Sequence, residues 1–566
     1  MNPIRIVGWC GVTALLALSL ALGPNHAIAF QRSPPSADEG VEVLTRGPVH
    51  EAFAETVTFD PQPGIVAPKA PPEAIEEIPP EQRPEGTNVA WIPGYWAWDD
   101  ERTDFLWVSG IWRALPPGRQ WVPGYWGRAG RGAQWTSGYW ADGDANEVEY
   151  LPEPPATVEA GPNVPAPSVD HIWLPGCWLW QQNRYAWRPG YWANGQSNWD
   201  WIPAHYVWTP RGYLFVDGYY DYSVARRGVL FAPVYFNSNV YSQQGFRYSP
   251  ATVINPAVFA SHLFLRPSYG HYYFGDYYGS NYSSNGFSPW FSFFSSRSGY
   301  DPFYAQQHWQ HRSNGQWNRQ IQADHAYRRD HESARPARTF AAQQQQRDGD
   351  NPRPQNMGSV IAQQLDQFRQ AKENSIRFQP VNDSDRQQFG ERGREAQMHR
   401  QQRQQLETSA VDPAAAPAAE GRTSARVNLP KSPFVAKRAD EFGENQRPPQ
   451  TPVLPQLDSK LVPKPRRQGL PAADGRPELP KVKTVPNVVP NILPKSVPKA
   501  ELKAEPKAEP KPARKVEPKA EPKPAPKAEP KAEPKPAPKV EPKAAPKSAP
   551  KDKPKDKPKN KPKGKP

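Results

Sequence analysis

Cysteine is nearly absent from this chain of 566 residues. Only Cys10 and Cys177 occur, and Cys10 lies in an N-terminal apolar run that we expect to be removed. A single remaining cysteine excludes an intramolecular disulfide and a zinc site built from cysteines. Cys177 stands where neighbouring repeats carry tyrosine, so we expect either a side chain packed in that slot or an intermolecular disulfide.

Apolar residues are also scarce, at 37% of the chain, and they are unevenly placed, because 17 of the 21 tryptophans lie between residues 91 and 208. We therefore expect the rest of the chain to be too poor in apolar side chains to form a core. After residue 29, no segment approaches the ~20 consecutive apolar residues of a transmembrane helix. We therefore expect no transmembrane span in the mature protein.

Catalytic motifs are missing as well. The sequence has no Gly-x-Ser-x-Gly elbow, no phosphate-binding loop with Lys-Ser/Thr and no His-Glu-x-x-His. Four histidines fall in a Gln/Arg-rich stretch, where solvent exposure is a simpler interpretation than a metal site needing three or four convergent ligands: His308, His311, His325 and His331. We predict that the protein is not an enzyme and that it has neither a metal site nor a cofactor.

Residues 1–29 are typical of a secretory signal peptide. Arg5 precedes an apolar run from Ile6 to Leu22, and Ala27-Ile-Ala29 resembles a small-x-small cleavage site. An uncleaved membrane anchor is the alternative. Export predicts a periplasmic, cell-envelope or secreted protein.

The most informative feature is an aromatic repeat. Trp91-Ile-Pro-Gly-Tyr-Trp96 recurs as Trp121-Val-Pro-Gly-Tyr-Trp126, and eight units can be traced. Most steps between units are 14 residues, which indicates one small structural unit copied along the chain. The units start at Trp91, Trp107, Trp121, Trp135, Trp173, Trp187, Trp201 and Phe215.

Each period fits a short strand followed by a turn, which predicts an antiparallel meander. Pro-Gly weakens an ordinary strand, so we predict a bulge there that brings Trp91, Trp96 and Trp98 onto one face. The repeat glycines would then take positive φ. Ala204 replaces glycine in one unit, which we expect to be distorted. A lone unit buries too little surface to fold, so neighbouring units must pack together.

The Trp-x-x-Gly-x-Trp spacing, with Tyr before the second Trp, resembles the YXWGXW (WXXGXW) repeat family of exported bacterial proteins. The resemblance covers residues 91–220, and seven of the eight units keep glycine. It implies an envelope or secreted location and nothing catalytic.

Composition divides the chain into six segments. We predict a signal peptide at 1–29, a Pro/Glu-rich segment at 30–88, an aromatic repeat β domain at 89–222 with an acidic insert at 142–168, a partly ordered Tyr/Ser/Asn-rich region at 223–330, Gln/Arg-rich low complexity at 331–450 and a disordered Pro/Lys/Ala/Glu tail at 451–566. The fold class is therefore mainly β, followed by regions of low order. Between 331 and 450 the only apolar helical pattern is Val360, Ile361, Leu365 and Phe368.

Two functional hypotheses follow. The first is a non-enzymatic, exported cell-envelope structural or interaction protein, whose Lys/Pro-rich arm contacts anionic wall or surface polysaccharide. For that arm, a solvated spacer is the alternative, and nucleic acid does not fit the compartment. The second is a carbohydrate- or peptidoglycan-binding module. Its stacking platforms would be tyrosines on an open sheet face, while the tryptophans form the core: Tyr95, Tyr125, Tyr139 and Tyr191.

Overall fold

A computed structural model describes residues 40–295, 298–348, 360–372, 374–408, 424–458 and 460–461. All of these belong to one compact unit, Met1–Pro486, and none to the second unit, Asn487–Pro566. The predicted signal peptide and the tail beyond residue 461 lie outside the described residues.

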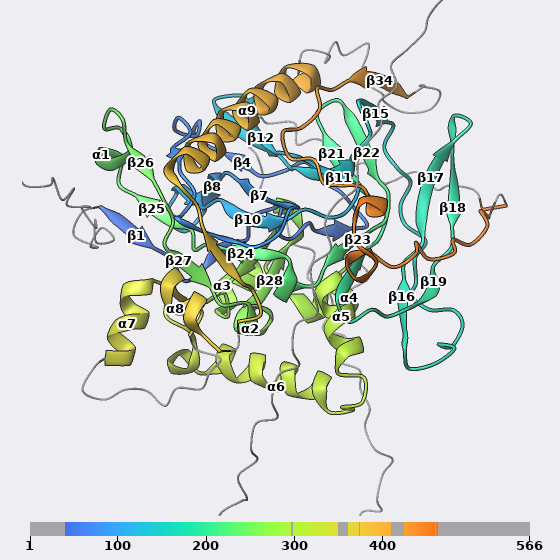
Figure 1. The fold of residues 1–566 in the computed structure, drawn as a ribbon. Coiled ribbons are helices and arrows are strands. Elements are labelled where there is room, and N and C mark those ends of the chain that lie inside the picture. Colours follow the sequence, from blue (N-terminus) through green and yellow to red (C-terminus); the bar gives the residue numbers. More distant parts are fainter. Residues whose placement is uncertain are drawn as a thin grey trace, which may run out of the picture. The chain divides into compact units, whose positions relative to one another are not determined.

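Strands dominate, as predicted, and pair in many small antiparallel sheets (Figure 1). Among the described strands, β5 (Glu76–Glu77) and β26 (Arg247–Tyr248) form a parallel pair. The repeat region contains β7 (Val89–Ile92), β8 (Tyr95–Asp99), β9 (Asp104–Val108), β10 (Ile111–Ala114), β11 (Arg119–Val122), β12 (Tyr125–Ala129), β13 (Gly132–Thr136), β14 (Tyr139–Asp142), β15 (Glu147–Leu151), β16 (His171–Leu174), β17 (Cys177–Gln181), β18 (Arg184–Arg188), β19 (Tyr191–Asn194), β20 (Trp199–Ile202), β21 (His205–Thr209), β22 (Gly212–Val216) and β23 (Tyr219–Tyr222).

The flanking segments add further short elements. The strands there include β1 (Val41–Val43), β2 (Gly47–Pro48), β3 (Val57–Thr58), β4 (Val66–Ala67), β5 (Glu76–Glu77), β6 (Gln82–Pro84), β24 (Gly228–Leu230), β25 (Val234–Phe236), β26 (Arg247–Tyr248), β27 (Thr252–Ile254), β28 (Leu263–Arg266), β29 (His271–Phe274), β30 (Ser288–Pro289), β31 (Gly299–Tyr300), β32 (Ala362–Gln364), β33 (Phe378–Pro380) and β34 (Ala425–Asn428). The α-helices include α1 (Ser238–Tyr241), α2 (Pro256–Phe259), α3 (Ser280–Ser284), α4 (Trp290–Ser295), α5 (Pro302–Gln310), α6 (Trp317–Asp330), α7 (Phe340–Asp348), α8 (Leu365–Gln370) and α9 (Asp383–Thr408). None of the described helices combines the length and the apolar content that crossing a membrane requires.

Two successive repeat units form one long, kinked β-hairpin. In hairpin 1 (β7–β10), the inner strands β8 and β9 pair next to the turn, and the outer strands β7 and β10 pair beyond the kink. Hairpin 2 (β11–β14), hairpin 3 (β16–β19) and hairpin 4 (β20–β23) repeat this arrangement. The first aromatic residue of each unit therefore lies opposite the second aromatic residue of its partner unit.

These cross-strand aromatic pairs have nearly constant geometry. In hairpin 1 the ring centroids of Trp91 and Trp112 are 5.2 Å apart, and those of Trp96 and Trp107 are also 5.2 Å apart. The other hairpins give separations between 4.8 and 5.4 Å. Edge-on and tilted contacts of this kind stabilise aromatic pairs beyond the apolar area that they bury.

The predicted bulge is wrong. Ile92 pairs with Ile111 and Tyr95 with Val108, so both strands skip two residues at the kink and the register continues unchanged. Without an extra residue, positions five apart point to opposite sides. Trp91 accordingly lies in a different apolar cluster from Trp96 and Trp98.

The repeat glycines do not take positive φ either. They are required because the tryptophan of the partner unit packs directly against them. A Cβ on Gly138 would lie 2.5 Å from the Trp121 ring, and a Cβ on Gly190 would lie 2.4 Å from the Trp173 ring. Such distances leave no room for a side chain.

The unit with Ala204 is not distorted, because hairpin 4 keeps the strand lengths and pairing of the others. The aromatic residue at the equivalent position of its partner unit is Phe215, whereas the other seven units begin with tryptophan. The smaller ring compensates for the added methyl group. Alanine and phenylalanine thus replace glycine and tryptophan together.

A carboxylate accepts hydrogen bonds at every kink. In hairpin 1, Glu77 accepts from the amides of Gly94 (2.7 Å) and Gly110 (2.9 Å) and from the Trp107 indole N–H (3.1 Å). In hairpin 2, Glu51 accepts from the Trp135 indole (2.8 Å) and the Gly138 amide (3.0 Å).

Hairpins 3 and 4 complete the series. Glu159 accepts from the Trp173 indole (3.2 Å) and the Gly176 amide in hairpin 3. In hairpin 4, Asp217 accepts from the amide of its neighbour Gly218 (2.8 Å). The kink frees backbone N–H groups from the strand ladder, and a buried N–H needs an acceptor. In hairpins 1, 2 and 3, one Trp-x-x-Gly unit thus supplies two donors, its indole and its glycine amide, to one carboxylate.

Carbonyl groups at the kinks of hairpins 1 and 2 accept hydrogen bonds from arginines of α9, the long helix that lies over β12 (Figure 1). Arg403 donates to the carbonyls of Pro123 (3.0 Å) and Ser137 (2.9 Å) and forms an ion pair with Glu407 (2.9 Å). Arg400 donates to the Gly94 carbonyl at 3.4 Å. The helix belongs to the Gln/Arg-rich segment, in which the sequence indicated a helical face only around Val360–Phe368.

One buried ion pair connects hairpin 1 to hairpin 4, and a second joins hairpin 4 to the segment that follows it. Arg113 of β10 contacts Asp221 of β23 at 2.6 Å, and Arg227 contacts Asp200 of β20 at 2.8 Å. All four side chains are 3% exposed or less. The two halves of the repeat region, separated by the insert 142–168, therefore share one buried polar core.

Buried carboxyl groups predict a pH dependence of stability. Burial raises the pKa of Glu77 to about 7, and the same cause raises the pKa values of Asp200 and Asp301 to about 7. In the unfolded chain these groups ionise near pH 4, so the unfolded state releases its protons first as pH rises. The free energy of unfolding should therefore fall between about pH 4 and pH 7 from these groups.

Glu77→Gln should make this slope shallower, by up to about 1.4 kcal/mol per pH unit, because one titrating group is removed. Denaturant unfolding at a series of pH values would measure the slope. Glu76→Gln, at an exposed neighbour, is the matched control and should leave it unchanged. Equal slopes in Glu77→Gln and the wild-type protein would contradict a neutral Glu77 at low pH.

Candidate functional site

A cavity of about 410 Å³ lies where hairpin 2, hairpin 4 and the strands β15 and β17 meet. The apolar part of its wall comes from Trp140 and Val122 of hairpin 2, Leu214 and Phe215 of β22, and Trp180 of β17. Phe215 and Trp180 are half-buried, so their rings remain partly accessible.

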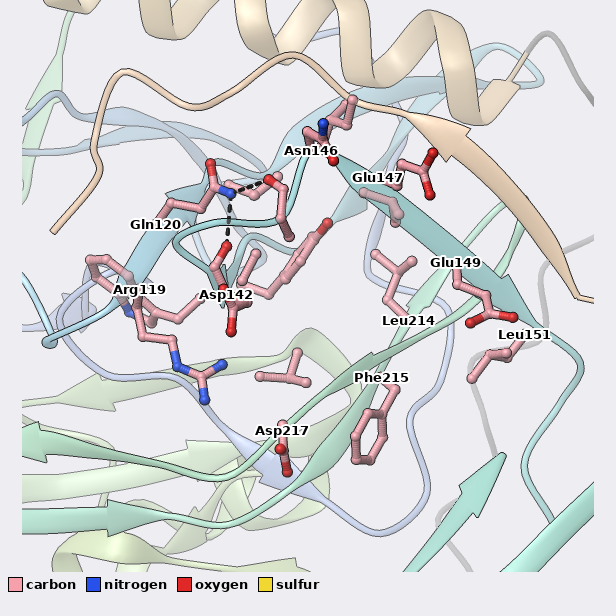
Figure 2. Close-up of a pocket in the computed structure, with 18 of the residues that line it drawn as sticks. Arg119, Gln120, Asp142, Asn146, Glu147, Glu149, Leu151, Leu214, Phe215 and Asp217 are labelled. Atoms are coloured by element: carbon pink, nitrogen blue, oxygen red, sulfur yellow. Dashed lines mark hydrogen bonds between the residues drawn. The ribbon is translucent and has the colours of Figure 1, made fainter. Parts of the chain in front are cut away.

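The polar part of the wall is acidic. Four carboxylates line it against a single guanidinium, Arg119: Asp142, Glu147, Glu149 and Asp217. Figure 2 shows Arg119 and Asp142 on one side of the cavity and Glu149 and Leu151 on the other. A ligand with hydroxyl or ammonium groups would find hydrogen-bond acceptors here beside aromatic rings.

Internal contacts hold several of these side chains. Gln120 donates to the carbonyls of Asp142 (2.8 Å) and Ala145 (2.7 Å), which fixes the loop after β14 (Figure 2). The Arg119 guanidinium stacks on the Tyr219 ring at 4.7 Å. Glu149 accepts from the Ser424 hydroxyl. The wall is therefore largely preformed, as ligand sites usually are.

The tyrosines predicted as stacking platforms do not lie on an open face. Tyr95, Tyr125 and Tyr139 are between 3% and 6% exposed. The Tyr125 hydroxyl donates to Glu407 at 2.7 Å, and the Tyr95 hydroxyl accepts from the Glu51 amide at 3.1 Å. These rings cannot stack on a sugar in this structure. The prediction that these three tyrosines lie exposed on an open sheet face is therefore wrong.

Tyr191 differs from the other three. It is half-buried, and burial raises its pKa to about 12. Of the four predicted tyrosines, only Tyr139 lines the cavity, together with its neighbour Trp140. The structure thus does not bring the four predicted residues together in one site.

Cys177 is packed in the tyrosine slot, the first of the two predicted possibilities. It is 8% exposed, and burial raises its pKa to about 12. A buried thiol that remains protonated does not readily form an intermolecular disulfide. Within the described part of the chain, no group of three His, Cys, Asp or Glu side chains is arranged to hold a metal ion.

Comparison with known families identifies the hairpins. The model of the WXXGXW repeat, which describes two copies, matches residues 86–113, 169–193 and 197–219. The chain carries WXXGXW repeats. No curated protein and no solved structure matches the chain.

The matched residues are hairpins 1, 3 and 4. Hairpin 2 (Arg119–Asp142) lies outside the matched ranges but has the same register, aromatic pairs and carboxylate. It is therefore a WXXGXW hairpin by structure. The residues that sequence reasoning missed are the acceptors, Glu51, Glu77 and Glu159, which lie outside the repeat units they bind.

Proposed function

We propose that this protein is a non-enzymatic, exported interaction protein of the cell envelope. In this proposal the WXXGXW hairpins form a rigid body, and the Lys/Pro-rich tail contacts anionic wall or surface polymers. The distribution of charge is the main support. Residues 487–566 contain 23 Lys and Arg against 10 Asp and Glu, a net charge of +13 that equals the net charge of the whole chain.

The burial of the repeat tryptophans also supports a structural role for the hairpins. Trp91, Trp107, Trp112 and Trp121 are at most 1% exposed. Rings this deeply buried are available for packing and not for ligands. Residues 1–486 carry no net charge, so attraction to an anionic polymer has to come from the tail.

Cosedimentation with an acidic polysaccharide tests the proposal. We expect the full chain to sediment with the polymer at low ionic strength and to be released at about 0.5 M salt, because exposed charges are screened there. A chain ending at Pro486 should remain in the supernatant, and a neutral glucan is the control polymer. Equal binding by the shortened chain, or binding that persists in high salt, would contradict a role for the tail.

Carbohydrate binding is a second candidate function, in the cavity and not on the predicted tyrosines. The observation that favours it is the cavity, which combines the half-buried rings of Trp180 and Phe215 with carboxylates. Binding there would survive high salt, because it relies on stacking. Trp180→Ala should abolish it, and Trp208→Ala, at a half-buried tryptophan outside the cavity, is the matched control.

A further inference from the structure

Hairpin 3 holds an extended, proline-rich segment of its own chain. The insert before β16 crosses the hairpin without joining a sheet from Pro152 to Ala160. It is held by side chains that donate to it. The Tyr185 hydroxyl donates to the Pro152 carbonyl (2.6 Å), and the Trp178 indole donates to the Ala156 carbonyl (3.0 Å).

Further along the insert, hairpin 3 also binds Glu159 and Val164. Glu159 occupies the kink, where the Trp173 indole and the Gly176 amide donate to it. Beyond it, the Trp192 indole donates to the Val164 carbonyl at 3.0 Å. Three indole N–H groups thus bind one short segment, and Pro154 and Pro155 are buried.

Hairpin 1 binds a second segment of the same kind. The Trp96 indole donates to the Glu73 carbonyl at 2.9 Å, and Glu77 occupies the kink. Trp96 and Trp178 are equivalent, since each is the second tryptophan of the first unit in its hairpin.

The two bound segments share a pattern. Glu73 directly follows Pro71-Pro72, and Ala156 directly follows Pro154-Pro155. In each segment the residue after the proline pair offers its carbonyl to the equivalent tryptophan, and a glutamate three or four residues later fills the kink. Aromatic surfaces commonly recognise extended proline-rich peptides through indole donors and stacked rings. The glutamate adds a charge-assisted bond that fixes the register.

We propose that hairpin 3 is a receptor for extended peptides of the pattern Pro-Pro-x-x-x-Glu, and that its own insert occupies the site until such a peptide from another molecule displaces it. The location of the insert supports exchange. Glu77, at the kink of hairpin 1, is 5% exposed and belongs to β5, which pairs with β26. Glu159 is only half-buried, and Ala156, Val158 and Ala160 are exposed. This inference does not depend on the tail or on its proposed polymer.

The insert competes with a free peptide for hairpin 3, and this competition lowers the affinity for the peptide. A tethered segment is present at a high effective concentration, so the wild-type chain should bind a free peptide weakly. Glu159→Ala removes the carboxylate that holds the insert at the kink, and it leaves the Trp173 indole and the Gly176 amide free to bind a peptide. We expect a fluorescein-labelled peptide with the sequence of residues 151–165 to bind the full-length Glu159→Ala variant at least about tenfold more tightly than the wild-type chain.

Two changes test whether the glutamate of an added peptide binds the kink of hairpin 3 as Glu159 does. A peptide with Gln in place of its glutamate should bind roughly tenfold more weakly, because a charged hydrogen bond is lost. Adding Trp173→Phe to the Glu159→Ala variant should weaken binding similarly, since the ring stays and its N–H is removed. Trp126→Phe in hairpin 2 is the matched control, and Glu147→Gln in β15 controls for loss of a nearby exposed charge.

Fluorescence polarisation would measure these affinities, and near-ultraviolet circular dichroism would verify that each variant is folded. If Glu159→Ala does not fold, the wild-type chain still tests the proposal at millimolar peptide. Saturable binding of the glutamate peptide, but not of its glutamine form, supports it there. Equal binding of both peptides, absence of binding to the folded chain, or no effect of Trp173→Phe would overturn the proposal.

Discussion

Gly138→Ala should lower the free energy of unfolding by about 3 kcal/mol, the upper part of the range for overpacked cores. The added methyl carbon would lie 2.5 Å from the Trp121 ring and 2.9 Å from the Gly124 amide nitrogen. Neither atom can move freely, because Trp121 is 1% exposed and the amide belongs to the backbone of the facing unit. Chemical denaturation monitored by circular dichroism would give the value.

A second substitution separates close packing from a general intolerance of the kink. Trp121→Phe should recover about 1 kcal/mol or more of the Gly138→Ala loss in a double-mutant cycle, because contacting residues couple by this amount. Hairpin 4 already contains the pair, as Ala204 and Phe215. Gly390→Ala in α9 is the control. Apart from nearby helix backbone, no atom lies within 4 Å of the Cβ that this alanine would add, and the change should stabilise the helix by about 0.5–1 kcal/mol. Additive effects at Gly138 and Trp121 would contradict the packing account.

Arg403→Ala should destabilise the protein by about 3–5 kcal/mol, the usual cost of leaving a buried charge without its partner. Glu407 would remain buried, with only the hydroxyl groups of Tyr125 (2.7 Å) and Tyr150 (3.1 Å) as donors. The carbonyls of Pro123 and Ser137 would also lose their donor. Thermal and denaturant unfolding would measure the loss.

The double substitution Arg403→Met with Glu407→Leu should restore most of this stability, because apolar side chains of similar size replace a buried ion pair at little cost. Arg394→Ala on the same helix is the matched control. Its side chain is 63% exposed, so the change should stay within about 0.5 kcal/mol. A loss below 1 kcal/mol in Arg403→Ala would show that α9 is not anchored to hairpin 2 through this residue.

The repeat period made the fold class predictable. Short strands, turns and buried tryptophans follow from a 14-residue spacing, and the structure has them. The details at the kink did not follow, because they depend on the partner strand. Whether Pro93-Gly94 is a bulge or a symmetric kink is decided by Ser109-Gly110, which interrupts β9 and β10 at the facing position. The close approach of Trp121 to Gly138 is likewise a property of two units.

The predicted tyrosine face was wrong for a related reason. Strand alternation suggests one buried face and one open face, but in hairpins 1 and 2 the tyrosines are covered as well. Tyr95 packs against His271 of β29, and Tyr125 packs under Arg403 of α9. Both partners are more than 150 residues away in sequence, and no local sequence pattern predicts these contacts.

Helix α9 was not predicted, because the residues on its buried face are mostly polar. Its buried residues fall three or four positions apart, as on any helical face, and three of the four are ionisable side chains: Ala396, His399, Arg403 and Glu407. A search for apolar periodicity does not detect such a stripe. The glutamates at the kinks were missed similarly, since an isolated Glu in a Pro-rich segment is ordinarily a solvated side chain.

Hydrogen exchange of the kink amides tests the central claim most directly, namely that each Trp-x-x-Gly kink binds a carboxylate. We expect slow exchange at Gly94, Gly110, Gly138 and Gly176, although none of these residues belongs to a strand. That protection should be lost at Gly94 and Gly110 alone in Glu77→Ala, which removes both carboxylate oxygens. Exchange at all four as fast as at the turn residue Gly130 would contradict the account.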